Sequence, residues 1–311
     1  MSYNYSNNVI NDIIKLLADN KMRGAFVPIS RLEDLARDRD EVKGGGFQSK
    51  HIEWWLSATE KLLPDDLGFE PKSIITVTAG SPKVALRFNY KGAPVDCILP
   101  PTYAAVSASE KGQFEFIQET IRQFGNNVKS VGLIPQKLLA VHSCLGKFGR
   151  NNIFYDDEFG SYAKIITFVT DVPCDGDAPW RAAVRMESCE SCLACVAACP
   201  TKAIDANRRM INADICITAL NERDGDFPDW IDKSAHNALI GCVMCQDCCP
   251  TNERNLDNIV RGVEFDESET LELLACGTEK PIPGELAAKF ESAGIWKHFT
   301  KHLPRNLAAL L

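Results

Sequence analysis

The sequence predicts an α+β protein, and three observations lead to that class. Strand-like and helix-like runs interleave from the N-terminus to about residue 175. Nine of the thirteen cysteines lie between Cys189 and Cys249, and the remainder of the chain reads as mainly helical. Interleaved strands and helices are typical of α/β and α+β domains. We therefore expect an α/β domain at residues 1–175, a cysteine module at 181–258 and a helical C-terminal tail at 259–311.

The elements of the first domain follow from apolar spacing and turn residues. Apolar residues at helical spacing predict a helix at 8–19, and Ser30 with Glu33 predicts a capping box that opens another. A short YKG segment predicts a hairpin between two strands. Further helices are expected at 50–63, 108–125 and 136–146. Strands are expected at 24–29, 73–79, 84–90, 93–99 and 128–134, and again after a loop at 156–160, ending at 172. Residues 173–180 read as a linker.

Composition and charge exclude several classes of protein. The chain is 45% hydrophobic and 24% charged, as in ordinary globular proteins. No apolar run approaches the roughly 18 to 20 residues of a membrane helix, and the N-terminus is unlike a signal peptide. A cytoplasmic protein without a membrane partner is expected. The net charge of −8 argues against a chain-wide nucleic-acid surface. We expect the basic stretch 289–305, which contains Lys297, His298, Lys301 and His302, to be a solvated helix face.

The spacing of the cysteines predicts two [4Fe–4S] clusters. The first run, CESCLACVAACP (189–200), has three cysteines at spacing three and a fourth before proline; the second, CVMCQDCCP (242–250), repeats the ending. In bacterial ferredoxins with this pattern, three cysteines of a run hold one cluster and the last ligates the other. The first cluster is then held by Cys189, Cys192, Cys195 and Cys249. The second takes Cys199, Cys242 and Cys245 and lacks one ligand.

Two cysteines compete for that fourth position. Cys248 would complete a second Cys-x2-Cys-x2-Cys run with Cys242 and Cys245. However, it neighbours Cys249, and adjacent residues point in different directions. Cys216, between the two runs, is the other candidate. Zinc has no use for a third cysteine at this spacing, and a reducing compartment disfavours disulfides. The scattered cysteines are expected to be small buried hydrophobes, namely Cys97, Cys144, Cys174 and Cys276.

Segments outside the cysteine runs carry a resemblance to a known family. LGKFGRN (145–151), EFGSY (158–162), ICIT (215–218) and LPRNLAALL (303–311) stand in the same order around the cysteine module as in epoxyqueuosine reductases. The chain resembles that family and, more distantly, the C-terminal half of corrinoid reductive dehalogenases. The family's isolated cysteine matches Cys216, which favours Cys216 over Cys248. The resemblance implies a cobalamin-reductase-like α/β domain followed by a ferredoxin-like module.

The resemblance also implies base-off cobalamin, held without a histidine ligand and reduced by the proximal cluster. The residues that would approach the corrin are Gly146, Gly149, Arg150, Asn151, Gly160, Ser161 and Tyr162. Turn glycines with a capping asparagine are the alternative interpretation of this segment. Tyr103 and Tyr162 are candidate proton donors by residue type, and no residue is assigned a catalytic role.

Departures from the family pattern point to a changed substrate. The family's proton-donor aspartate falls at Ser130 and its following glutamate at Gln136, and a hydroxyl with a pKa far above 7 cannot replace a carboxylic acid. The family's cofactor-side segment is not visible near Tyr103, and its tRNA-holding helical repeat is missing, so tRNA is not an expected partner.

Three functions compete. The first is a cobalamin-dependent iron–sulfur reductase acting on a small-molecule or corrinoid substrate, with a low-potential donor of ferredoxin or flavodoxin type. The second is an electron-transfer protein or corrinoid reactivator. The third is a non-catalytic cobalamin-binding protein.

Overall fold

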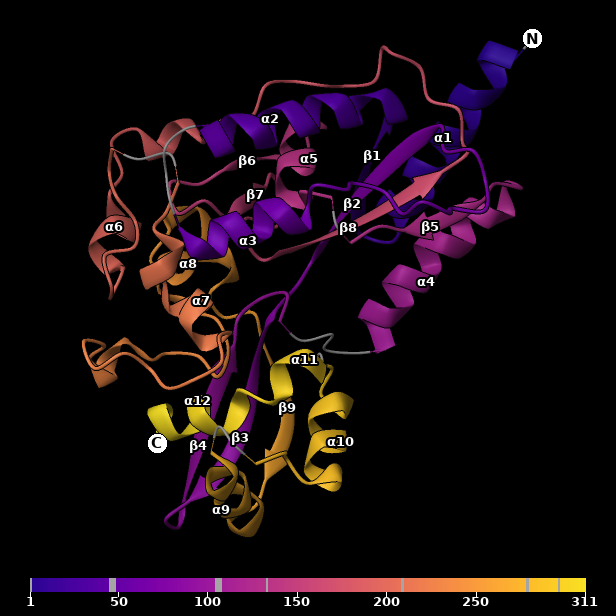
Figure 1. Cartoon of the computed structure of the whole chain (residues 1–311). Coiled ribbons are helices and arrows are strands. Elements are labelled where there is room, and N and C mark those ends of the chain that lie inside the picture. Colours follow the sequence, from indigo (N-terminus) through magenta and orange to yellow (C-terminus); the bar gives the residue numbers. More distant parts are fainter. Residues whose placement is uncertain are drawn as a thin grey trace. The chain divides into compact units, whose positions relative to one another are not determined.

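A computed structural model describes residues 2–44, 49–103, 108–132, 134–207, 210–277, 280–295 and 297–311 (Figure 1). The chain forms two compact units, each built from two stretches of sequence. Unit 1 comprises Met1–Gly80 and Gly112–Ser191, and unit 2 comprises Ser81–Lys111 and Cys192–Leu311. The α+β class is confirmed, since helices and mainly antiparallel sheets make up both units.

These units differ from the three consecutive parts expected from the sequence. Residues 81–111 and 259–311 join residues 192–258 of the cysteine module in unit 2, whereas residues 181–191 fall in unit 1. The tail also contains a strand, β9 (Ile259–Phe265), which pairs in parallel with β3 (Lys83–Tyr90). The pairing joins residues that are 176 positions apart, such as Lys83 and Ile259, and local apolar patterns do not show which strands pair.

Unit 1 is organised around a four-stranded antiparallel sheet with the order β1-β2-β8-β5. Its strands are β1 (Met22–Pro28), β2 (Ser73–Gly80), β8 (Ala163–Thr170) and β5 (Val128–Ser130). Alternate side chains of β2 serve opposite faces: Ile75 and Val77 pack in one hydrophobic cluster and Ile74 in another. This alternation is the ordinary period of two of a β-strand.

Helices cover both faces of this sheet. Helices α1 (Ser2–Asp19) and α4 (Ala108–Gln123) pack on the Ile75 face, and α2 (Leu32–Gly44) and α5 (Gln136–His142) on the other. Helix α3 (Lys50–Ala58) follows α2. The expected capping box does not form, because the chain makes a 3-10 turn, η1 (Ile29–Arg31), and α2 begins only at Leu32. A hairpin of β6 (Gly146–Phe148) and β7 (Phe154–Asp156), which the sequence did not predict as strands, completes the unit.

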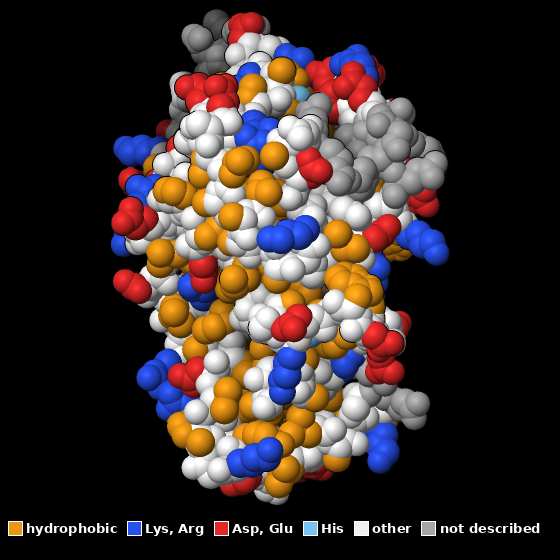
Figure 2. Space-filling view, turned by 90° about the vertical axis from the view of Figure 1, so that its left-hand side faces the viewer, with side chains coloured by type: hydrophobic (Ala, Val, Ile, Leu, Met, Phe, Trp, Pro, Cys, Tyr) orange, Lys and Arg blue, Asp and Glu red, His pale blue; other side chains and the backbone are white. Residues whose placement is uncertain are grey.

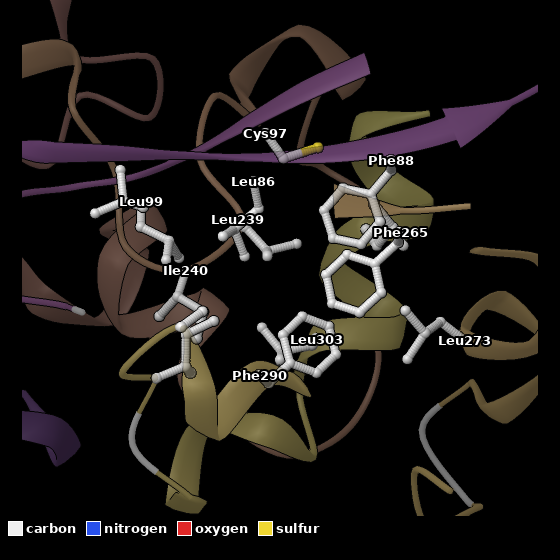
Figure 3. Packing of buried hydrophobic residues seen from close by; sticks show 14 of the residues in the cluster. Leu86, Phe88, Cys97, Leu99, Leu239, Ile240, Phe265, Leu273, Phe290 and Leu303 are labelled. Carbon is white, nitrogen blue, oxygen red and sulfur yellow. The ribbon is translucent and has the colours of Figure 1, made fainter. Parts of the chain in front are cut away.

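Unit 2 contains a three-stranded sheet with the order β4-β3-β9, β4 being Ala93–Leu99. The predicted β3–β4 hairpin is present, and its turn residues Lys91 and Gly92 have φ of 50° and 74°. Figure 3 shows the core against this sheet, where the rings of Phe88 and Phe265 stack with centroids 4.7 Å apart. Cys97 lies in this core, 3% exposed, as expected of a small hydrophobe.

Short elements carry the cysteine module, and longer helices follow it. The module contains η2 (Glu187–Cys189), α6 (Ala194–Ala198), η3 (Ala213–Ile215), α7 (Ile217–Asn221), η4 (Lys233–Ala235), α8 (Met244–Asp247) and η5 (Pro250–Asn255). The tail helices are α9 (Glu267–Cys276), α10 (Gly284–Ser292), α11 (Lys297–Thr300) and α12 (Leu303–Leu310). Across the described ranges, no helix is long and apolar enough to cross a membrane.

The basic stretch 289–305 is not the solvated helix face that the sequence predicts. Lys289 pairs with Glu269, with Nζ to Oε1 at 2.8 Å. His302 and Arg305 are buried, at 6% and 9% exposure, whereas Lys301 is exposed. The side chains at 297 and 298 lie outside the described part. The periodicity alone could not show that α12 turns its cation inward.

Candidate metal centre

None of the thirteen cysteines forms a disulfide bond. Cys97 and Cys276 are buried as predicted, and Cys144 and Cys174 are half-buried. Burial raises the pKa of the Cys97 thiol to about 12 and that of Cys174 to about 11, so both remain protonated at neutral pH. Neither thiol belongs to a cysteine run, and their burial fits small packing groups.

Three cysteines of unit 2 form one group of neighbouring thiols, which we call the Cys216 group: Cys199, Cys216 and Cys242. Burial raises the pKa of Cys242 to about 11, and the thiols of Cys216 and Cys199 add to the rise. Burial likewise raises the pKa of Cys216, with a contribution from Cys199. Cys245, on α8, packs in the same apolar cluster as Cys199 and Cys216, together with Cys195. Soft thiolates in an apolar setting are the ligand set that iron–sulfur clusters use.

Polar hydrogens point at the sulfurs of the Cys216 group. The backbone N–H of Ala203 donates to Cys199 Sγ at 3.2 Å, and the Asn237 side-chain amide donates to Cys242 Sγ at 3.2 Å. The backbone amides of Thr218 and Ala219 and the Thr218 hydroxyl bond the Cys216 thiol. Hydrogen bonds to sulfur stabilise thiolates and tune cluster potentials. Sequence reasoning did not identify Asn237, because nothing in the local pattern shows that its amide reaches Cys242.

Cys248 lies among different thiols. Burial raises the pKa of Cys248 to about 11, and Cys195, Cys249 and Cys192 add to the rise. Helices α6 and α8, which carry these two runs, pack against each other. The neighbours of Cys248 are thus cysteines that the sequence assigns to the first cluster.

No three His, Cys, Asp or Glu side chains, among those that the structure describes, lie close enough to hold a single metal ion. A cubane cluster makes a different demand, because each thiolate binds a different iron atom and the four thiolates stay well apart. The wider gathering of thiols, with its N–H donors, fits a cluster better than one ion.

Cys189 belongs to the end of unit 1, where Arg150 holds it. The buried Arg150 guanidinium donates to the carbonyl oxygen of Cys189 and, at 3.3 Å, to that of Glu190. Arg150 is 7% exposed. The hairpin that carries LGKFGRN therefore anchors the loop of the first cysteine run.

The other residues predicted to approach a corrin also serve the packing of unit 1. A Cβ at Gly146 would lie 2.1 Å from the carbonyl oxygen of Tyr155, and one at Gly149 would lie 2.5 Å from Asn151 Oδ1. Asn151 is buried and its amide donates to the Tyr155 hydroxyl at 3.0 Å. The two glycines are therefore required by the β6–β7 hairpin itself.

The EFGSY segment is a tight loop closed by Asp156. The backbone groups of Asp156 and Gly160, with φ of 60° at the glycine, bond each other at 2.9 and 3.0 Å. The Asp156 carboxylate accepts from Thr78 at 2.7 Å and pairs with Arg23 at 2.8 Å. Ser161 and Tyr162, which follow, are 4% and 1% exposed. A depression along α4, lined by residues from Gly112 to Arg122, borders none of the seven residues. The seven lie in unit 1, where the described contacts of Gly146, Gly149, Arg150 and Asn151 serve the packing of that unit.

The candidate proton donor Tyr103 lies in unit 2, near the Cys216 group. Its hydroxyl donates to Glu222 Oε1, and its ring packs 5.5 Å from that of Phe299. Burial, the Glu222 carboxyl and the thiols of Cys216 and Cys242 hold the pKa of Tyr103 well above its usual range. Burial raises the pKa of Glu222, and the bond from Tyr103 partly offsets this. Tyr103 is thus a neutral phenol whose proton is already bonded.

Ser130, which the resemblance matches to the family's aspartate, ends β5 and is exposed, and Gln136 begins α5 and is half-buried. On the face that carries α6, charged side chains of both signs are interspersed with hydrophobic ones (Figure 2). Leu193, immediately before α6, is 48% exposed.

Comparisons with known proteins first identify the class of protein to which the cysteine module belongs. Residues 188–252 match the family described as a 4Fe-4S double cluster binding domain. The protein is therefore an iron–sulfur protein with a double-cluster module, and the predicted [4Fe–4S] chemistry is confirmed.

Similar proteins of known name are epoxyqueuosine reductases. Epoxyqueuosine reductase from Staphylococcus aureus is 31% identical over 180 residues, which span 56% of this chain but only 44% of that protein. A structure of the Bacillus subtilis enzyme, whose catalytic aspartate loop is swung out of the active site, aligns with a TM-score of 0.64 and 21% identity over 98% of this chain and 82% of that one. An epoxyqueuosine reductase bound to a modified tRNA stem loop gives 0.65 and 20%, over 98% and 81%. A reductive dehalogenase matches only weakly, with a TM-score of 0.38 and 14% identity. The chain is similar in sequence to epoxyqueuosine reductases and shares their fold, as the resemblance predicted.

Proposed function

We propose that this protein is an iron–sulfur reductase related to epoxyqueuosine reductase, acting on a different substrate. Its double-cluster module accepts single electrons from a low-potential donor of ferredoxin or flavodoxin type and passes them on. The observation that carries the proposal is the double-cluster module in a chain with the fold of these reductases. A cytoplasmic location is part of the proposal.

The proposed ligands follow from spacing and from the neighbours of each thiol. The first cluster takes Cys189, Cys192, Cys195 and Cys249, and the second takes Cys199, Cys216, Cys242 and Cys245. The choice of Cys216 over Cys248 is supported by the thiols beside each: Cys216 neighbours Cys199 and Cys242, whereas Cys248 neighbours the first set. Exposed Leu193, inside the first run, supports electron entry at the first cluster.

A changed substrate is supported by Ser130. This position is an exposed hydroxyl at the end of β5, and no carboxylic acid stands there to donate a proton. A small molecule or a corrinoid fits the proposal better than epoxyqueuosine in tRNA.

Cobalamin is proposed only as a partner to be tested. When bound, it would supply a strongly reducing cobalt centre, but the seven residues expected around it are used by the packing of unit 1. No reaction step is assigned through it. The same observation favours a second candidate, an electron-transfer protein or corrinoid reactivator that delivers electrons to a separate protein. Non-catalytic cobalamin binding is the third candidate from the sequence.

The ligand set is tested by iron analysis after anaerobic purification. The wild-type chain should hold about eight iron atoms. Cys216→Ser should lose one cluster, about four iron atoms, while Cys248→Ser should keep both. Loss of iron in Cys248→Ser with retention in Cys216→Ser would contradict the assignment.

The three functions are separated by an absorbance spectrum with and without added cobalamin. Bound cobalamin that the reduced clusters convert to Co(I) supports the reductase. Bound cobalamin that they cannot reduce favours the binding protein. Failure to bind cobalamin leaves the electron carrier.

A further inference from the structure

The last helix of unit 2 reaches back to both loops that carry ligands of the proposed second cluster. Arg305 and Asn306 lie in the first turns of α12, at 9% and 1% exposure. A buried guanidinium needs many acceptors, since desolvation without partners is costly. These acceptors are carbonyl oxygens at and just beyond the end of α7, which follows Cys216.

Arg305 binds the C-terminal end of α7. Its Nη2 donates to the carbonyl oxygens of Leu220 and Asn221, both at 3.1 Å. Its Nη1 donates to that of Arg223 at 2.8 Å and to that of Gly225. The last carbonyls of a helix lack partners within the helix and favour a cation. Arg305 therefore fixes the helix that Cys216 caps.

Asn306 connects that helix to the loop before Cys242. Its amide donates to the carbonyl oxygen of Asn221 at 3.1 Å and to that of Leu239 at 2.9 Å. The Asn221 side chain, itself fully buried, extends the link by donating to the Gly241 carbonyl at 2.7 Å. Two ligand-bearing loops are thus joined to each other and to α12 through buried amides.

The same network ends at a ligand sulfur. Asn237, five residues before Cys242, accepts from the Val243 backbone N–H at 2.9 Å and donates to Cys242 Sγ at 3.2 Å. Asn237 therefore holds the loop at Cys242 and Val243. Asn306 and Asn221 hold the middle of the same loop through its carbonyl oxygens.

We propose that Arg305 and Asn306 are positioning residues of the second cluster, fixing the separation between Cys216 and Cys242. This inference rests on the proposed ligand set. Neither residue touches the cluster in this role; both act through the α7 end and the 237–243 loop. Because the bonds are buried and multiple, the two cysteines are held in place without depending on the iron.

The test measures the rate at which a chelator removes iron from anaerobic protein, followed by the EPR signals of the two reduced clusters. The signal missing in Cys216→Ser identifies the second cluster. In Asn306→Ala, iron should leave the second cluster about tenfold faster than in the wild type, with the first cluster unchanged. Arg305→Lys keeps the cation but not the forked donor set, and should show the same selective effect.

The matched control is Leu307→Ala, in the same helix. Leu307 is buried in the hydrophobic core and truncating it destabilises α12 by a cavity, without touching the amide network. Its two clusters should lose iron at the wild-type ratio. Equal acceleration in Leu307→Ala and Asn306→Ala, or acceleration of both clusters alike, would overturn the positioning role. If Asn306→Ala does not accumulate, Arg305→Lys decides by the same comparison. A wild-type chain with about four iron atoms would overturn the ligand set and this inference together, whereas about eight with equal release overturns the inference alone.

Discussion

Replacing Arg150 discriminates between the two interpretations of the LGKFGRN segment. If Arg150 anchors the first cysteine run, Arg150→Met should loosen the loop that carries Cys189. If Arg150 contacts a corrin, the same change should weaken cobalamin binding and leave the iron in place. The structure favours the anchor, since the guanidinium donates to the carbonyl oxygens of Cys189 and Glu190.

The magnitude follows from burial at the two acceptors. A hydrogen bond from a charged group contributes about 1.5–3 kcal/mol, and an unsatisfied buried carbonyl costs about 1–3 kcal/mol. Cys189 is buried and bears this cost, whereas Glu190 is exposed and its carbonyl can bind water. Loop opening should therefore become easier by about 2–4 kcal/mol, which is roughly 30- to 1,000-fold in population.

The assay is iron release to a chelator under anaerobic conditions, with EPR to follow each cluster, beside a cobalamin titration. Arg150→Met should release the iron of the first cluster selectively. Lys147→Met is the matched control, because Lys147 lies in the same hairpin but pairs only with exposed Glu187 at 3.8 Å. An exposed pair contributes about 0–1 kcal/mol, so little change is expected. Wild-type iron release together with weaker cobalamin binding in Arg150→Met would refute the anchor.

Three further predictions concern single sites. Burial raises the pKa of Glu222, so its contribution to stability is complete below the ordinary carboxyl pKa and is lost as pH rises through the raised pKa. Thermal unfolding should show Glu222→Gln gaining stability relative to the wild type as pH rises above the ordinary carboxyl range, and an unchanged difference would contradict this. Gly146→Ala places a methyl group 2.1 Å from the Tyr155 carbonyl oxygen and should cost about 3 kcal/mol or more, measured as a lower unfolding temperature; wild-type stability would show that the hairpin relaxes. Cys97→Ala should cost about 1 kcal/mol of stability with full iron content, and loss of iron would make Cys97 a ligand.

Local features of the fold could be predicted because neighbouring residues determine them. The β3–β4 hairpin follows from two strand-like runs joined by Lys91 and Gly92, whose positive φ the turn requires. The cysteine spacing likewise determined the cluster chemistry, since ligand geometry is encoded over about ten residues. Strand β9 was missed although IVRGVEF contains three β-branched residues and a phenylalanine, and what no local pattern could show is its pairing with β3.

Residue roles at the site depended on contacts that no local pattern encodes. LGKFGRN indicated a glycine-rich turn, but only the positions of Tyr155 and Asn151 show why Gly146 and Gly149 cannot carry a side chain. Arg305 lay in a stretch that appeared basic and solvated, and its acceptors are about 80 residues earlier. Its burial follows from the α7 end, which needs donors.

The source of a proton for the reaction bears on the choice between reductase and electron carrier. The resemblance implies that Ser130 stands in place of the family's acid, and Asp156, buried in unit 1, is held as an acceptor by Arg23 and Thr78. Among the described carboxyl groups with a resolved shift, Glu222 has the raised pKa that a proton donor requires, but it lies in unit 2 and bonds Tyr103. An electron carrier needs no proton donor, so it is compatible with the serine that the resemblance places at the family's acid position.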